Sequence, residues 1–310
     1  MSGDTGATQM AYRIRHKDRS AGAAVRRIAR QQVEAALACI DGTTGDAGRT
    51  LHEVRKRCKK IRALLRLVHP GLDADGAGNA AFRAIAAPLG PRRDADVLLE
   101  TFDDLLTDCS APEVAALAPV RAALGRHRET IRARDDTDIL LREARDALAA
   151  TLPHIARWTL ENDGFAAYSQ GLEARYRRGR RTMREACRSG DAEAFHRWRK
   201  CSKDLAFHLR LLGPIWPGPM RAQRTCADAL GDTLGRHHDL AVLAAQAGRM
   251  SDIPAQAVEA LVAHIGARQR ALAQAANALG ARLYAEPPRA LAKSWRRRYA
   301  AWGRERDCKG

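Results

Sequence analysis

Strand-forming patterns and aromatic residues are scarce in this sequence. Phe, Trp and Tyr together make up 5% of the 310 residues, and no stretch alternates apolar and polar positions as a half-buried strand does. Apolar residues recur instead at helical spacing, for example at Val25, Ile28, Val33 and Leu37. The sequence therefore predicts an all-α fold.

Long apolar runs and paired cysteines are also missing. No run approaches the ~20 apolar residues that a membrane-spanning helix needs, and the N-terminus has no apolar signal core. The seven cysteines form no Cys-x-x-Cys pair, so their spacing indicates neither a zinc site nor a disulfide framework. We expect a soluble cytoplasmic protein with reduced thiols and no membrane partner.

The familiar catalytic motifs are absent as well. The sequence contains no Walker-type phosphate loop, no Gly-x-Ser-x-Gly and no His-Glu-x-x-His. It also has no Glu-x-Glu pair, and so lacks the carboxylate cluster with which many triphosphate hydrolases hold metal. These absences predict a protein that is not an enzyme and that carries no cofactor and no metal.

Positive charge is the feature that the chain has in excess. Lys and Arg number 53 against 36 Asp and Glu, which gives a net charge of +17. Such a surplus favours a polyanionic partner: nucleic acid, an anionic membrane surface or a phosphate polymer. Composition does not choose among these. The excess of Arg over Lys suits phosphate recognition and a GC-rich codon bias equally well.

Two motifs occur twice, in the same order. His-x-x-Arg-Lys-x-x-Lys spans 52–59 and 196–203, and Leu-Gly-x-x-x-Asp-x-x-Val-Leu spans 89–98 and 234–243. The first histidine lies 42 residues before the motif aspartate in the first copy and 43 in the second. This repetition indicates an internal duplication. With about four helices in each half, we expect two four-helix bundles related by a pseudo-twofold axis.

The composition divides the chain into five parts. Residues 1–20 are predicted to be a flexible lead-in, 21–150 the first bundle and 151–165 a connection. Residues 166–285 form the second bundle in this scheme, and 286–310 a basic C-terminal tail.

Each copy of the first motif is predicted to be one helix with a basic stripe. On a helical wheel the repeated cations fall within a sector of roughly 100°, and apolar residues occupy the other side. The apolar side is expected to pack into a core and to leave the basic side facing a partner. The repeated stripe residues are His52, Arg55, Lys56, Lys59 and Arg66 in the first copy and His196, Arg199, Lys200, Lys203 and Arg210 in the second.

The first stripe helix has two features of its own. Thr50 lies three residues before Glu53, which fits a capping box at the helix start. Arg62 extends the stripe where the second copy has Ala206. A single basic stripe is most often a solvated face, but a doubled stripe favours phosphate binding, because Arg offers paired donors and Lys a compact charge.

Neighbouring residues leave alternatives open. Arg27 and Arg30 on the preceding helix, and Arg178 and Arg181 in the second half, either widen the basic patch or belong to solvated faces. The histidines of the stripes also suit phosphoryl acceptance or metal ligation. Metal is disfavoured because no further ligand lies three or four residues away on the same side outside the stripe.

The two motif aspartates resemble catalytic carboxylates, but structural ion pairs are the better prediction. We expect Asp94 and Asp239 to pair with the basic residues or imidazoles just before them, which are Arg92, Arg93, His237 and His238.

The paired motifs together resemble the CHAD family, the conserved-histidine α-helical domain, from about residue 20 to residue 283. The resemblance implies two four-helix bundles and a basic groove between them that binds inorganic polyphosphate. It also implies association with polyphosphate granules. The family's basic positions carry over onto the stripe residues of both copies.

We therefore expect a non-enzymatic polyphosphate-binding protein. The alternative is a nucleic-acid-binding protein, which would need stacking aromatics beside the basic patch. The segment Trp295-Arg296-Arg297-Arg298-Tyr299 is the one stretch that fits this alternative. An enzyme acting on polyphosphate is a third class, and it lacks visible metal ligands or a nucleophile.

Overall fold

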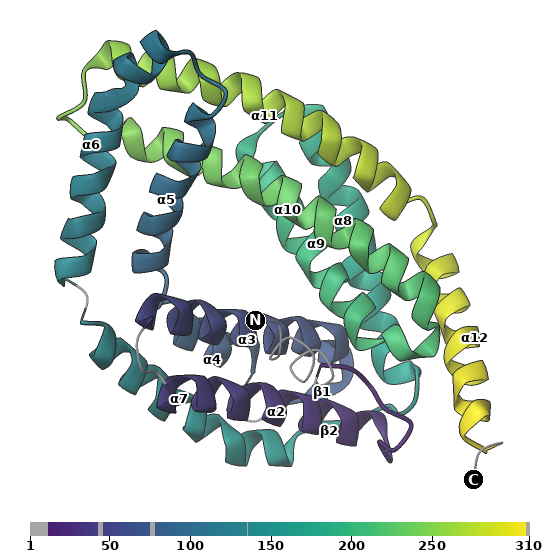
Figure 1. The fold of residues 1–310 in the computed structure, drawn as a ribbon. Coiled ribbons are helices and arrows are strands. Elements are labelled where there is room, and N and C mark those ends of the chain that lie inside the picture. The colour runs from purple at the N-terminus through teal and green to yellow at the C-terminus, as the bar shows by residue number, and fades with distance from the viewer. Residues whose placement is uncertain (1–11, 43–45, 75–77, 135, 308–310) are drawn as a thin grey trace.

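The computed structural model describes residues 12–42, 46–74, 78–134 and 136–307. Nearly all of these residues are helical, which confirms the all-α class (Figure 1). The helices are α2 (Ala21–Asp41), α3 (Ala47–Val68), α4 (Asn79–Ala86), α5 (Pro91–Leu106), α6 (Ala111–Arg134), α7 (Thr137–Arg157), α8 (Ala166–Ser189), α9 (Ala192–Leu211), α10 (Pro217–Ala247), α11 (Ala255–Leu283) and α12 (Pro288–Asp307).

Short elements complete the described part of the chain. Two 3-10 turns follow the stripe helices, η1 (His69–Gly71) after α3 and η2 (Gly213–Ile215) after α9. The strands β1 (Leu72–Asp73) and β2 (Thr159–Leu160) form one antiparallel pair. This pair fastens the end of the first stripe helix to the connection that leads into the second half. No helix in the described ranges combines the length and the apolar character that a membrane crossing requires.

Aspartates begin both stripe helices. Asp46 accepts a hydrogen bond from the Arg49 amide at 3.1 Å, and Asp191 accepts one from the Ala194 amide at 3.1 Å. An N-cap carboxylate satisfies an amide that has no partner within the helix, and it suits the positive end of the helix dipole. The capping box predicted for Thr50 is wrong, because α3 starts one turn earlier and the Thr50 hydroxyl donates to the Asp46 carbonyl.

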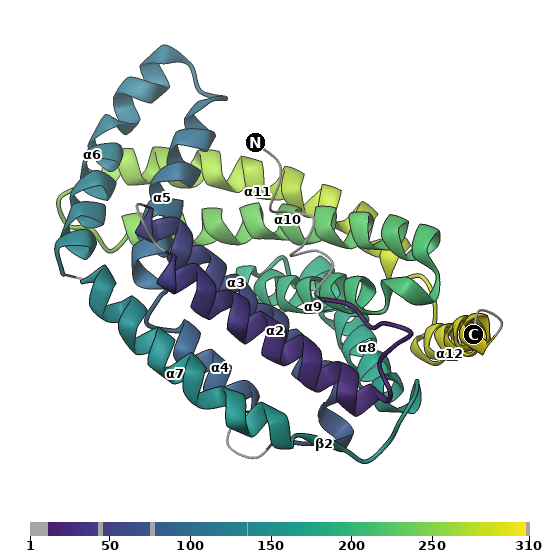
Figure 2. The ribbon, with the colours of Figure 1, turned by 60° about the horizontal axis from the view of Figure 1, so that its bottom comes forward.

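The helices enclose an open centre. In Figure 1, α2, α3, α4 and α7 lie along the bottom, α5 and α6 at the left, and α8 to α11 along the right. Figure 2 shows α10 and α11 side by side over much of their length, and they share one of the largest contact surfaces in the molecule. The helix α12 packs mainly against α8 and η2. The segment 286–310, expected to be a tail, thus carries a docked helix in its described part.

The apolar core has two parts, and both halves of the chain contribute to each. The larger part joins α2, α3 and α7 to α8, α9 and the start of α10, with Ile61 and Trp198 among its fully buried members. The smaller part joins α5 and α6 to the end of α10 and to α11, around Phe102 and Leu261. The two halves therefore share their cores, and their division into two bundles about a pseudo-twofold axis stays a prediction.

A glycine sets the approach of α8 to α3. A Cβ atom at Gly171 would overlap the backbone of Leu67, whereas a Cβ at Gly125, inside α6, would meet no atom within 4 Å. The close approach at Gly171 brings the second half onto the end of the first stripe helix, so it helps to fix where that helix lies.

Replacing Gly171 by Ala should therefore destabilise the protein by about 1–3 kcal/mol or more, because the helices must move apart. The matched change Gly125→Ala should stabilise it by up to ~1 kcal/mol, through the higher helix propensity of Ala. Urea unfolding followed by circular dichroism measures both. Equal effects of the two changes would show that α8 and α3 are not held at this close distance.

Candidate anion-binding site

The two stripe helices pack directly against each other. The buried ring of His208 on α9 lies with Nε2 at 3.0 Å from the carbonyl oxygen of Ala63 on α3. Near the same crossing, Arg66 of α3 makes a two-pronged ion pair with the buried carboxylate of Asp204 on α9, with Nε at 2.9 Å from Oδ2. The duplicated motifs, 144 residues apart in sequence, therefore meet in space.

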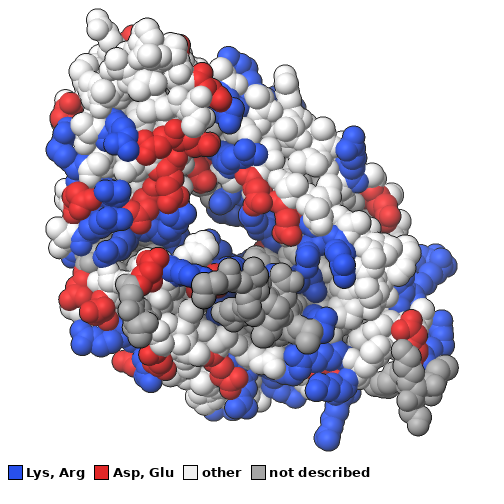
Figure 3. All heavy atoms as spheres, viewed as in Figure 1, with Lys and Arg blue, Asp and Glu red and all other residues white. Residues whose placement is uncertain are grey.

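The molecule has a hollow at its centre (Figure 3). Figure 3 shows Lys and Arg side chains around much of the central hollow, with Asp and Glu side chains gathered on one side of it. In the ribbon of Figure 1 the surrounding helices are α3, α5 and α10. A concave surface with one dominant charge sign concentrates the field that an anion experiences.

Lys59 shows that the two stripes act on one another. Its side chain reaches water, yet protein surrounds it closely enough to lower its pKa to about 8. Burial is the largest cause, followed by the charge of Arg55 on its own helix. The next like-charge contribution comes from Arg199 on α9, and Lys203 adds to it, while Asp94 opposes them. We call the stripe residues of α3 and α9 around Lys59 the α3–α9 cluster.

Lys60 lies next to this cluster, on the buried side of α3, and it was not predicted. Its side chain is 1% exposed, and burial together with the charges of Arg210, Arg57 and Lys56 lowers its pKa to about 7. The ammonium group lies 6.0 Å from the centre of the Tyr12 ring. On a helical wheel Lys60 falls outside the basic stripe, so the periodicity argument overlooked it. The signal that could have found it is the adjacent pair of lysines within an otherwise amphipathic helix.

Arg55 joins the two repeated motifs into one unit. Its guanidinium Nη1 donates to the carbonyls of Leu89 (3.5 Å) and Gly90 (3.2 Å) and to the Asp94 carboxylate (3.2 Å). The guanidinium also lies against Gly90, since a Cβ added there would be in ordinary contact with Arg55 Nη2 at 3.7 Å. The glycine and the aspartate of the second motif thus contact the arginine of the first motif. We call this pair of residues the arginine seat.

The second copy repeats this seat. A Cβ at Gly235 would lie 3.6 Å from Nε of Arg199. Burial raises the pKa of the Asp239 carboxyl, and the charge of Arg199 is the largest influence opposing that rise. Asp94 acts on Asp239 as well, so the two seats lie near one another.

The predicted pairing of Asp94 with Arg92 or Arg93 is wrong. Arg93 instead pairs with Glu100 at 2.8 Å, and Arg92 donates to the Thr137 hydroxyl. Arg92 and Arg93, which directly precede the aspartate in sequence, lie in the first turn of α5 and make other contacts. The ion pair of Asp94 is made by Arg55, 39 positions away in sequence.

The stripe histidines are held as neutral rings. Burial, then the charges of Lys200 and Arg199, lowers the pKa of His196 to about 4. Its ring stacks on that of His238, with centroids 4.0 Å apart. Burial is also the largest cause that lowers the pKa of His52. At neutral pH both stripe histidines can donate a hydrogen bond to an oxyanion without adding charge.

Several stripe cations already have acidic partners. Lys56 lies 2.9 Å from Glu53, and Lys203 lies 2.8 Å from Asp232. Arg62 donates to the Asn79 side chain at 3.2 Å. These contacts hold extended side chains in defined positions, and the exposed ones are weak enough for a multivalent anion to replace.

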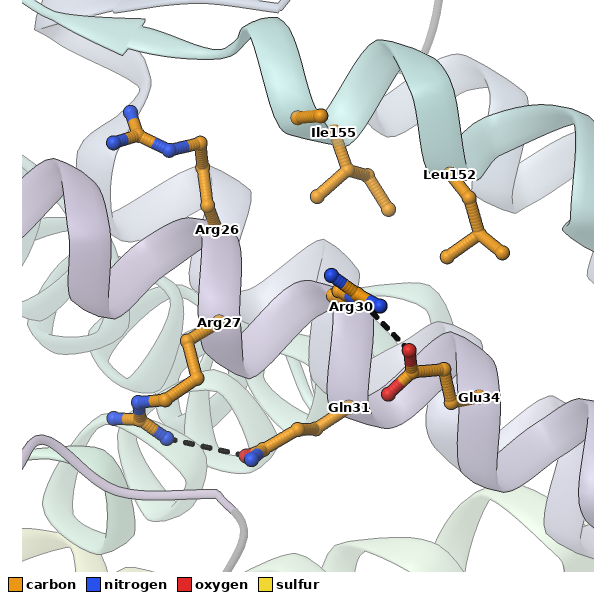
Figure 4. A pocket seen from close by; sticks show the side chains of 8 residues that line it. Arg26, Arg27, Arg30, Gln31, Glu34, Leu152 and Ile155 are labelled. Carbon is orange, nitrogen blue, oxygen red and sulfur yellow. Dashed lines mark hydrogen bonds and ion pairs between the residues drawn. The ribbon is translucent and has the colours of Figure 1, made fainter.

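The flanking arginines are distributed differently. Arg27 pairs with Asp18 at 2.7 Å and Arg30 with Glu34 at 2.6 Å. Both line a concavity between α2 and α7, beside apolar side chains such as Leu152, and no stripe residue lines it (Figure 4).

The flanking arginines of α8 are both exposed. Arg181 pairs with Glu185 at 3.4 Å on its own helix. Arg178 acts on Arg175, whose guanidinium is 3.8 Å from Asp204. Of the four flanking arginines, Arg178 therefore extends the basic surface at the α3–α9 crossing.

By its fold and its candidate site, the protein is an all-α domain in which two repeated cationic helices pack against each other. The chain belongs to the CHAD domain family, whose model matches residues 27–248. The family predicted from the repeated motifs is thereby confirmed.

Solved structures agree with this fold. PptA from Streptomyces chartreusis is 15% identical, with a TM-score of 0.58, over 86% of this chain and 99% of its own. The CHAD domain from the plant Ricinus communis is 20% identical, with a TM-score of 0.57, over 90% of this chain and 92% of its own. No curated protein gave a match.

The ion pair at the helix crossing should carry much of the stability of the site. Asp204→Asn should destabilise the protein by about 3 kcal/mol or more, because Arg66 and Arg175 would lose their buried counter-charge. Asp103→Asn, which breaks an exposed pair with Arg121, should cost less than ~1 kcal/mol. Thermal and urea unfolding of both variants measure this difference. A loss for Asp204→Asn no larger than for Asp103→Asn would contradict a stabilising role for the crossing pair.

Proposed function

We propose that this protein binds inorganic polyphosphate at the α3–α9 cluster. The observation that carries the proposal is the packing of the two stripe helices against each other, which brings Arg199 and Lys203 of α9 close enough to Lys59 of α3 for their charges to act on it. Cations held this close are unfavourable unless an anion neutralises them. Membership of the CHAD domain family supports a polyphosphate-related function.

The chemistry suits a phosphate polymer. Arg and Lys donate charge-assisted hydrogen bonds to phosphate oxygens, and the neutral histidines add further donors. In this proposal the polymer runs along the hollow, touches both stripes, and replaces the half-buried carboxylate of Glu53 and the exposed one of Asp232. Affinity then arises from many weak contacts. It should fall steeply with salt, because binding releases counterions from the polyanion.

We propose a binding role without catalysis. Two of the carboxylates beside the cluster are engaged as partners of arginines, Asp94 with Arg55 and Asp204 with Arg66. Their positions suit orientation of the basic side chains. A cytoplasmic location and an association with polyphosphate granules complete the proposal, on the ground of the family resemblance.

The nucleic-acid alternative loses its main support in the C-terminal segment. Trp295 is 1% exposed and belongs to the apolar core, so it offers no face on which a base could stack. Arg298 lies over the ring of Trp216, 4.0 Å from its centre, and so occupies one face of that exposed aromatic. Single-stranded nucleic acid binding relies on free aromatic faces beside basic residues.

A competition titration tests the proposal directly. Long-chain polyphosphate is expected to displace labelled duplex or single-stranded DNA at about physiological salt, at equal phosphate concentration. A preference for either DNA would overturn the assignment in favour of nucleic acid.

Charge reversal should locate the site. Lys56→Glu combined with Lys200→Glu changes one cation on each stripe and should weaken polyphosphate binding at least ~10-fold. The control pair, Lys293→Glu with Arg296→Glu, makes the same change in net charge on exposed positions of α12. Isothermal titration calorimetry at fixed salt measures both. Equal losses would show that net charge alone determines binding.

Affinity should also fall as the pH rises from 7 to 9. Lys59 is protonated below its pKa of about 8 and neutral above it. If bound phosphate restores the ordinary lysine pKa, the affinity falls about tenfold over this range. The free folded state gains stability from this group over the same range, because its folded pKa lies below the unfolded one. Loss of binding would therefore not reflect unfolding caused by Lys59.

Lys59→Met is the matched variant for this experiment. It should bind polyphosphate more weakly at pH 7, show a shallower pH dependence, and unfold at a higher temperature than the unaltered protein. An unchanged pH slope in this variant would place the titrating group elsewhere.

A further inference from the structure

A second group of reactive side chains lies away from the α3–α9 cluster, where α6 meets α11. Cys109 precedes α6, Glu113 lies in its first turn, and His264 projects from α11. The Cys109 Sγ atom is 3.9 Å from His264 Nδ1, and the Glu113 carboxylate is 3.5 Å from His264 Nε2. One donor atom from each residue fits within 4.8 Å of the others.

We propose that these three residues form a zinc site. A cysteine thiolate, an imidazole nitrogen and a carboxylate oxygen are the three donor types that zinc takes from proteins. The sulfur donor argues against magnesium and calcium, which prefer oxygen alone. Tetrahedral zinc with ordinary bond lengths places its sulfur and nitrogen ligands about 3.6 Å apart. The observed 3.9 Å between Cys109 and His264 is close to that value.

The carboxylate is oriented before any ion arrives. The amide and the hydroxyl of Ser110 donate to Glu113 Oε2 at 2.7 and 2.6 Å, so Oε1 is the oxygen that faces His264. The contact from the Ser110 amide is one half of a capping box, in which a glutamate three residues on accepts from the amide of the residue that precedes the helix. A hydrogen-bonded carboxylate of this kind is typical of metal sites, where outer contacts hold the ligands in place.

Small side-chain rotations would complete the coordination. The two nitrogens of His264 face the thiol and the carboxylate separately, and a single ion takes only one of them. All three side chains are partly exposed, so the ring and the carboxylate have room to turn and the ion has a path of entry. Water fills the fourth position, as it does in other three-ligand zinc sites.

The site would cross-link the two halves of the chain. Cys109 and His264 lie 155 residues apart in sequence, so no spacing motif marks them. The helices they join belong to the smaller apolar part of the core. A bound ion stabilises the folded state in proportion to the logarithm of its concentration over its dissociation constant. We therefore expect a bound zinc ion to stabilise the contact between α6 and α11, independently of anion binding.

Cobalt substitution tests the proposal on the full chain. The reduced, metal-free protein should bind one equivalent of Co²⁺ and develop a sulfur-to-cobalt charge-transfer band, which Zn²⁺ should remove. Zn²⁺ should also raise the unfolding temperature. Cys109→Ser should abolish the band, and Glu113→Gln or His264→Gln should weaken zinc binding at least ~10-fold.

Two other cysteines supply the controls. Cys187→Ser removes an exposed thiol that contacts Asn277, and Cys308→Ser removes the last cysteine of the chain. Both should keep the band and the zinc affinity. Absence of the band in the unaltered protein, or its persistence in Cys109→Ser, would overturn the site. Polyphosphate titrations of the same variants should be unchanged, which separates this proposal from the anion-binding one.

Discussion

Repulsion between like charges is the constraint on which the centre of this protein depends. Two helices that each carry a row of cations are packed together, and their opposite faces are buried in a common apolar core. The ion pair of Arg66 with Asp204 anchors the crossing and places one negative charge among several positive ones. Hydrophobic burial keeps the rows close, and burial, followed by the neighbouring positive charges, lowers the pKa values of Lys59 and Lys60.

The structure gives the repeated motifs a physical meaning. In each copy an arginine of the stripe lies against a glycine further along the chain, with an aspartate nearby. The guanidinium of Arg55 is fixed as part of the fold by its contacts with Leu89, Gly90 and Asp94. Lys59 and Lys200, which belong to the same repeated motif, remain open to water.

Helical periodicity predicted the class of fold, and motif spacing led to the two helices that carry the proposed site. Both signals are local, because residues three or four apart share one face of a helix. Contacts between segments that are far apart in the sequence produce no such local pattern. The partner of Asp94, the burial of Lys60 and the meeting of Cys109 with His264 all depend on how helices are packed. The shared core escaped prediction for the same reason, because two halves of similar pattern do not reveal whether each encloses its own apolar residues.

That shared core bears on how a repeated chain of this kind could arise. Apolar side chains of both halves fill both parts of the core, so a single copy would expose a large apolar surface to water. An ancestor with one copy would have needed to associate with a second identical chain, as an obligate homodimer does. After fusion of two such copies into one chain, each copy could acquire substitutions independently. The difference between Arg62 and Ala206 at corresponding positions is of this kind, because a symmetric homodimer has the same residue in both copies.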